Sequence, residues 1–75
     1  MDFDTCNLEI KKYLNHINKT YIAKDNSHSI TIDSFKCLTE IHTPNVWYIY
    51  VHYINNTSSI SGTIRLSDFL KNYSL

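Results

Sequence analysis

Apolar residues recur at helical spacing near the start of the chain. The stripe consists of Cys6, Ile10, Tyr13, Leu14 and Ile17. Apolar positions gathered on one side in this way predict an amphipathic helix. Asp4 or Thr5 could cap its beginning, because either side chain can accept a hydrogen bond from a free backbone N–H. The composition becomes strand-like after Asn18, where we expect the helix to end.

From Lys19 onward the pattern changes to the period of two that is typical of half-buried strands. Segments rich in Asn, Asp, Ser or Pro separate the apolar stretches and predict turns. The predicted turns are Lys24–Ser27, Thr43–Asn45 and Asn55–Ser58. The predicted strands are residues 19–23, a stretch from His28 to about His42, residues 46–54 and residues 59–66.

The stretch from His28 to His42 changes phase. Ile30 and Ile32 share one parity, whereas Phe35, Cys37 and Ile41 share the other. A period-two pattern that changes phase must bend, bulge or break. We therefore expect a short strand, a kink at Asp33–Ser34 and a further strand from Phe35.

The run Val46–Ile54 is the most strongly strand-like part of the chain, because it consists of β-branched and aromatic residues and one histidine. Its alternation separates two kinds of face. One face carries Trp47, Ile49, Val51 and Tyr53, and the other carries Tyr48, Tyr50 and His52 beside Val46 and Ile54. The first set is typical of a core. The second, aromatic rings with polar ends, is typical of a contact surface.

The last strand and the C-terminal helix repeat this division. Ile60, Ile64 and Leu66 alternate with Ser61, Thr63 and Arg65. Gly62 falls on the apolar parity, which a bulge or the close approach of a large ring would explain. Ser67 is expected to cap a short helix whose apolar side is Phe69, Leu70 and Tyr73.

Together these elements predict one α+β domain spanning residues 1–75. It has an N-terminal helix, an antiparallel meander of three to four strands and a short C-terminal helix, with both helices packed on one sheet face. The other face would carry the candidate partner-binding residues, which are Tyr48, Tyr50, His52, Thr63 and Arg65. Whether the Phe35 segment covers this face stays open.

The charge balance narrows the range of partners. Seven basic and seven acidic side chains give a net charge of zero. Nucleic-acid binders usually carry a basic excess, and a DNA mimic would need a dense acidic surface. Single-strand binding remains an alternative, because small sheets with exposed aromatic rings can stack bases.

Candidate catalytic and metal-binding groups are dispersed. Four histidines lie in different elements without ligand spacing, and Cys6 and Cys37 are too far apart in sequence for a zinc or redox motif. No nucleophile elbow or glycine-rich phosphate loop is present. We therefore expect no enzyme activity, metal or cofactor, and two ordinary buried thiols.

The N-terminal residues do not form a signal peptide, and no apolar run approaches the roughly 18 residues that a membrane helix needs. These features predict a cytoplasmic protein. A chain of this size buries only about 60% of its unfolded surface, so we also expect a homodimer. The strand Val46–Ile54 is the expected place for self-association.

No motif identifies a family. In general character the chain resembles the small accessory proteins of phages and mobile elements: short, neutral, without a catalytic signature, and rich in residues with AT-rich codons. This resemblance implies a protein that binds and blocks a host protein machine in the host cytoplasm, for example a CRISPR or restriction effector. An immunity protein or antitoxin would have the same features and is the further alternative.

Overall fold

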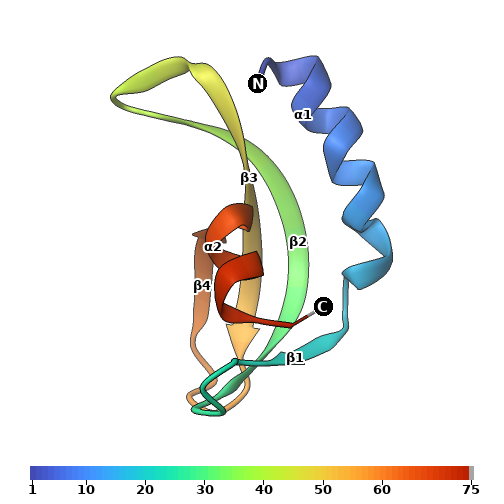
Figure 1. The fold of residues 1–75 in the computed structure, drawn as a ribbon, viewed down its shortest axis with the longest axis vertical. Helices are drawn as coiled ribbons and strands as arrows, with labels where there is room; N and C mark the ends of the chain where they lie inside the picture. Colours follow the sequence, from blue (N-terminus) through green and yellow to red (C-terminus); the bar gives the residue numbers. More distant parts are fainter. Residues whose placement is uncertain (75) are drawn as a thin grey trace.

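The computed structural model describes residues 1–74 and forms a four-stranded sheet with helices at either end of the chain (Figure 1). The strands pair antiparallel in chain order. The elements are α1 (Phe3–Ile10), a 3-10 helix η1 (Lys11–His16), β1 (Thr20–Ile22), β2 (Ser29–Glu40), β3 (Thr43–Asn55), β4 (Ser61–Arg65) and α2 (Leu66–Asn72). The predicted α+β meander is confirmed.

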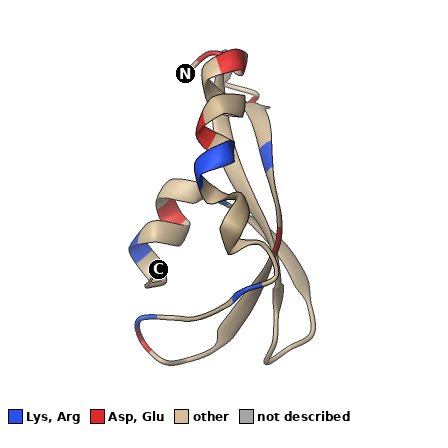
Figure 2. Ribbon diagram, turned by 90° about the vertical axis from the view of Figure 1, so that its right-hand side faces the viewer, with Lys and Arg blue, Asp and Glu red and all other residues tan. Residues whose placement is uncertain are grey.

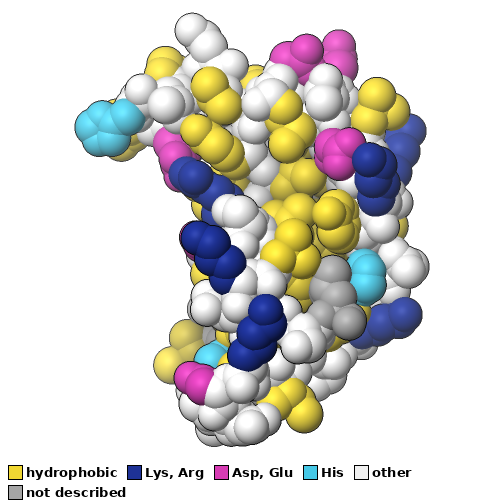
Figure 3. All heavy atoms as spheres, viewed as in Figure 1, with side chains coloured by type: hydrophobic (Ala, Val, Ile, Leu, Met, Phe, Trp, Pro, Cys, Tyr) yellow, Lys and Arg dark blue, Asp and Glu magenta, His cyan; other side chains and the backbone are white. Residues whose placement is uncertain are grey.

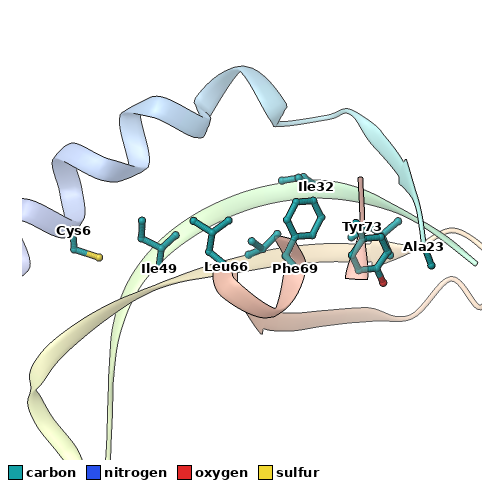
Figure 4. Packing of buried hydrophobic residues seen from close by; sticks show 9 residues of the cluster. Cys6, Ala23, Ile32, Ile49, Leu66, Phe69 and Tyr73 are labelled. Atoms are coloured by element: carbon teal, nitrogen blue, oxygen red, sulfur yellow. The ribbon is translucent and has the colours of Figure 1, made fainter. Parts of the chain in front are cut away.

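Both helices lie on the same side of the sheet, as the two ribbon views show (Figures 1 and 2). The core fills the space between them. Figure 4 shows its side chains in a row from Cys6 to Ala23. The largest fully buried side chains are Phe69, Ile30, Ile32, Val51 and Cys6. On this side of the molecule hydrophobic side chains gather in the middle, with Lys and Arg side chains nearer the rims (Figure 3).

The N-terminal helix begins earlier than predicted. Asp2 is its N-cap, and the carboxylate accepts a hydrogen bond from the N–H of Thr5 at 2.7 Å. Thr5 is therefore the donor at this cap, and the prediction of Asp4 or Thr5 as the capping residue was wrong. The α-helix tightens into η1 at Lys11, and the helical segment ends before Asn18, which has a positive φ of 66°.

The phase change in the second predicted strand is a β-bulge within one continuous strand. Ile32 pairs with Tyr53 and Ser34 with His52, so Asp33 is the extra residue of β2. A single extra residue shifts the alternation of faces by one position, so the apolar residues on both sides of it point to the same face of the sheet. Phe35 therefore packs against the same core as Ile32, with its ring 5.9 Å from that of Tyr13. It does not cover the tyrosine row of β3.

The turn predicted at Thr43–Asn45 was wrong. The chain reverses at Ile41 and His42, and Thr43 already pairs with Glu40. The next pair joins Thr39 to Trp47, so Pro44 and its two successors have no partner in the ladder. Proline has no N–H to donate, which fits it to an interruption of this kind. Ile41, which shares the strand parity of Phe35 and Cys37, is 93% exposed at the turn.

Two predictions at the C-terminal end also need correction. Helix α2 begins at Leu66, so Arg65 is its N-cap position, without a side-chain hydrogen bond, and Ser67 lies inside the first turn. Leu66 is the first residue of this helix and is buried. Ile60 lies before β4 and is exposed, because the turn continues through Ser59, whose φ is 62°.

Strand β1 is the edge strand beside β2, and the residues directly after it also contact the C-terminal segment. It pairs with β2, and at its end Ala23 forms an isolated bridge with Tyr73. The N–H of Lys24 also donates to the carbonyl of Asn72 at 2.8 Å. A three-residue strand is thus held by a segment almost fifty positions later in the chain.

The glycine at position 62 is explained by its neighbour Tyr53, which lies directly opposite it in the pairing of β3 with β4. A Cβ atom at position 62 would lie 2.6 Å from the hydroxyl oxygen of Tyr53 and 2.7 Å from its Cζ. The ring therefore occupies the space that a side chain would need. The prediction of a large ring close to this glycine is confirmed.

Replacing Gly62 with alanine is expected to lower the free energy of unfolding by about 1–2 kcal/mol, because the Tyr53 ring must leave its position. Urea denaturation followed by circular dichroism measures the change. In a Tyr53→Leu background the same substitution should cost almost nothing, since the ring is absent. An equal cost in both backgrounds would show that the ring is not the cause.

Candidate functional site

The sheet face opposite the helices is left uncovered by the elements of residues 1–74. We call it the open face. It carries Ser34, Lys36, Leu38 and Glu40 of β2, Tyr48, Tyr50 and His52 of β3, and Thr63 and Arg65 of β4. The register places Tyr50 opposite Arg65 and His52 opposite Thr63, whereas the intervening Ile49 and Val51 are buried on the helix side. All five predicted partner-binding residues therefore lie on one face.

A cross-strand network organises the centre of this face. The guanidinium of Arg65 lies over the ring of Tyr48, 4.1 Å from the ring centroid, and forms an ion pair with Glu40. The hydroxyl of Tyr50 donates a hydrogen bond to the same carboxylate. Three strands thus contribute to one cluster, and the aromatic rings of Tyr48 and Tyr50 are held by polar contacts at their edges and faces.

The network determines the protonation of its members. The hydrogen bond from Tyr50, together with the Arg65 pair, lowers the pKa of Glu40 below its ordinary value of 4.5. The same hydrogen bond raises the pKa of Tyr50. Glu40 is therefore ionised and Tyr50 protonated at neutral pH. A lowered folded-state pKa means that the contribution of Glu40 to stability is present above 4.5 and is lost as the pH falls through the lower value.

His52 and Thr63 form a separate pair on the same face. The Nδ1 atom of His52 lies 3.0 Å from the Thr63 hydroxyl. Lys36 of β2 pairs with Tyr50 on the side of β3 that faces away from β4. The pairing of the strands therefore fixes the positions of the aromatic rings, the Glu40 carboxylate and the cationic groups relative to one another on the open face.

An apolar pocket of about 210 Å³ adjoins Tyr48 and Arg65. Its walls include Met1, Leu66 and Leu70. The pocket lies where β4 has ended, since Arg65 is the last residue that pairs with β3. It extends the contact surface from the aromatic residues of the sheet toward α2.

Sequence reasoning missed Glu40, the residue that joins Tyr50 to Arg65. A signal was present, because Glu40 has the parity opposite to Phe35 and Cys37. Once the bulge turns Phe35 to the core, that parity places Glu40 on the open face. Its contact with Arg65, however, joins residues 25 positions apart on two strands that β3 separates, and it could not be read from periodicity.

A second polar cluster lies at the other end of the molecule. The Ser27 hydroxyl donates to the carboxylate of Asp25 at 2.7 Å, and Nδ1 of His28 lies 2.7 Å from the same hydroxyl oxygen. Because the single hydroxyl proton goes to the carboxylate, the imidazole N–H must donate to Ser27. In the neutral ring, the other nitrogen then accepts from the hydroxyl of Tyr73. This order of donors orients the buried Tyr73 and does not activate Ser27 as a nucleophile.

The two thiols meet where α1 crosses the sheet. Cys6 is fully buried, and burial together with the neighbouring Cys37 raises the pKa of its thiol to about 12. Cys37 is half-buried, and its thiol lies 3.6 Å from the side-chain oxygen of Asn7. Both are free thiols. The buried Cys6 therefore stays protonated and serves as a packing residue.

Within the described residues, no three or more His, Cys, Asp and Glu side chains gather in a group that could hold a metal ion. Among residues 1–74 no helix has the length and apolar character needed to cross a membrane. No family model, curated protein or solved structure matches the chain.

Proposed function

We propose that the protein is a small non-enzymatic binding module whose open face engages another protein. Tyr48, Tyr50, His52, Thr63 and Arg65 are the contact residues. Tyrosine and arginine dominate the energetic centres of protein interfaces, because they supply large contact areas and several hydrogen bonds. The cluster of Tyr48, Tyr50 and Arg65 around Glu40 is the observation that carries this proposal.

The cluster favours binding because its side chains are already ordered. Association costs free energy for each flexible side chain that becomes immobilised. Here the Arg65 guanidinium rests on the Tyr48 ring and is paired with Glu40. A partner would therefore meet a preformed surface, and the adjoining apolar pocket could receive one of its hydrophobic side chains.

The same contacts make a protein a better partner than nucleic acid. The Glu40 carboxylate would repel a phosphate backbone, and it already neutralises Arg65. The guanidinium also covers one side of the Tyr48 ring, where a base would have to stack. Single-strand binding therefore remains the second candidate, supported by the exposed aromatic sheet alone.

The proposed partner is a protein machine of a host cell, which the module binds and blocks in the host cytoplasm. This part of the proposal rests on the resemblance to phage and mobile-element accessory proteins in size, neutrality and composition. An immunity protein or antitoxin would bind its target by the same physics. The proposal also includes a homodimer, because a domain of 75 residues gains buried surface by self-association.

Tyr50→Ala is expected to weaken partner binding by about thirtyfold or more, as the loss of a hot-spot side chain does. Immobilised protein would be used to capture its partner from a low-GC bacterial lysate, the partner identified by mass spectrometry, and the affinity measured with the purified pair. Leu8→Ala is the matched control, because Leu8 is exposed on α1 and away from the open face.

The unfolding transition of each variant separates binding from stability. We expect the midpoint of Tyr50→Ala to change little. A large loss of stability with unchanged association would assign Tyr50 to a structural role. Co-elution of nucleic acid, with affinity that falls steeply as salt rises, would instead support the single-strand alternative.

A further inference from the structure

Among residues 1–74, no strand lies beside the outer edge of β2 over its second half. Strand β1 pairs only with Ser29–Thr31, and the last main-chain contacts on this side join Ile32 to Asn18 and Lys19. From Ser34 to Glu40 no residue within 1–74 continues the ladder. In Figure 2 this part of the sheet runs beside α1 and forms the rim of the molecule.

The main-chain groups of this edge point outward at alternate residues. In an antiparallel pair, two opposed residues either bond each other or both point away. Trp47 donates its N–H to the carbonyl of Met1, outside the β2–β3 pair. Thr39, which is opposite Trp47, must therefore direct its own N–H and C=O away from β3, and so must Cys37, two residues earlier.

The side chains along this edge have a self-complementary order. On the open face Lys36, Leu38 and Glu40 follow one another at strand spacing. Leu38 is 41% exposed although it lies in the middle of a strand. A cation and an anion placed symmetrically about an apolar residue are what a strand needs to pair with an antiparallel copy of itself.

We propose that a second copy of the chain pairs with this edge of β2, with Leu38 opposite Leu38 across a two-fold axis. Lys36 of each copy then faces Glu40 of the other. The residues that alternate with them, Cys37 and Thr39, become the hydrogen-bonded pairs of the ladder, so the outward groups identified above find partners. The two leucines meet at a non-hydrogen-bonded position, where side chains lie closest.

Charge selects this register over its neighbours. Moving the axis to Lys36 would oppose two lysines, and moving it to Glu40 would oppose two carboxylates. A register centred on Cys37 would place Lys36 against Leu38. The Glu40 carboxylate can accept a further hydrogen bond from the second copy, because two oxygens offer about four acceptor sites and Arg65 and Tyr50 occupy two.

A two-fold axis between antiparallel strands runs perpendicular to the sheet. The two open faces would therefore point to the same side and form one continuous surface across both copies. This deepens the self-association proposed above by assigning its interface to the edge of β2, in place of the strand Val46–Ile54 expected from the sequence, and it leaves Tyr50 free for another partner. The dimer does not depend on that partner, so the purified protein alone tests it.

Sedimentation equilibrium over a wide concentration range is expected to show a mass rising from 8.8 kDa toward twice that value. Lys36→Glu and Glu40→Lys each place like charges in both symmetric pairs, so each variant should dimerise at least about tenfold more weakly than the natural chain. An equimolar mixture of the two variants should recover dimers, because every pair is then of opposite charge. Isotope labelling of one variant identifies the mixed dimer by native mass spectrometry.

Two further variants keep the test independent of folding. Leu38→Lys opposes two cations at the axis without altering the Glu40–Arg65 pair, and it should also weaken the dimer. Lys71→Glu, on α2, makes the same charge change as Lys36→Glu and should leave association unchanged. A natural chain that stays monomeric at all concentrations, or a dimer whose strength ignores the β2 variants, would overturn the proposed interface. Neither result would affect the capture experiment for the open face.

Discussion

Deletion of Lys36 is expected to lower the free energy of unfolding by about 3 kcal/mol or more, whereas deletion of Asp33 should cost less than about 1 kcal/mol. Both residues lie in β2, and both are exposed. The difference arises from the bulge. Asp33 is the extra residue, so its removal leaves Ile32 and Phe35 on the core side and joins their partners into a regular ladder.

Removal of Lys36 has the opposite consequence. The residues before or after the gap must exchange faces. If the bulge absorbs the loss, Ser34 replaces Phe35 in the core and the Phe35 ring loses its contact with Tyr13. If it does not, Cys37 leaves the core and Leu38 enters it. Either outcome removes a large part of a stability that is about 4–11 kcal/mol for a domain of this length.

Chemical denaturation of the two deletions measures this difference directly. Lys36→Ala and Asp33→Ala are the matched controls, because they remove the same side chains without changing the phase, and each should lie within about 0.5 kcal/mol of the natural chain. Equal stabilities of the two deletion variants would show that the bulge does not set the faces of β2.

Phe69→Ala is expected to have the second large effect, a loss of about 3–5 kcal/mol. Phe69 is the largest of the fully buried side chains. Its ring stacks on that of Tyr73 at a centroid distance of 5.2 Å and forms a T-shaped pair with that of Tyr21 at a centroid distance of 5.7 Å. The substitution therefore removes the contact that joins α2 to β1, and we expect the protein to be largely unfolded at 37 °C.

A thermal melt followed by near-ultraviolet circular dichroism measures this loss, because the signal reports the packing of the tyrosines. Phe69→Leu is the conservative control and should retain a cooperative transition with a smaller decrease. An unchanged melting temperature for Phe69→Ala would mean that the packing of α2 through Phe69 does not stabilise the core.

The parts of the fold that periodicity controls were predictable. Burial on one side of a strand requires apolar and polar residues to alternate, so the sequence of Val46–Ile54 indicates its two faces. In the same way, the change of phase at Asp33 indicates the position of the bulge. Gly62 revealed a close ring in the same way, because an apolar position without a side chain must be filled by a neighbour. These features depend on residues close in sequence or directly opposite in the ladder.

The features that were not predictable arise from competition between similar local signals. Asp2, Asp4 and Thr5 can all cap a helix, and the residue next to Asp2 is held by a contact far away in sequence, since the N–H of Trp47 donates to the carbonyl of Met1. Pro44 suggests a turn, but the two-residue reversal at Ile41–His42 leaves it in the strand instead. The position of that reversal then decides that Glu40 reaches Arg65, 25 residues later.

The bridge between Ala23 and Tyr73 has a consequence for how the protein is made. Strand β1 is synthesised early, but the segment that completes its outer side is synthesised fifty residues later. The hairpins of β2, β3 and β4 join neighbouring segments and can form as soon as they emerge, whereas closing a long loop is slow. The end of β1 can therefore complete its main-chain contacts only after Tyr73 has been synthesised, although its residues are among those translated first.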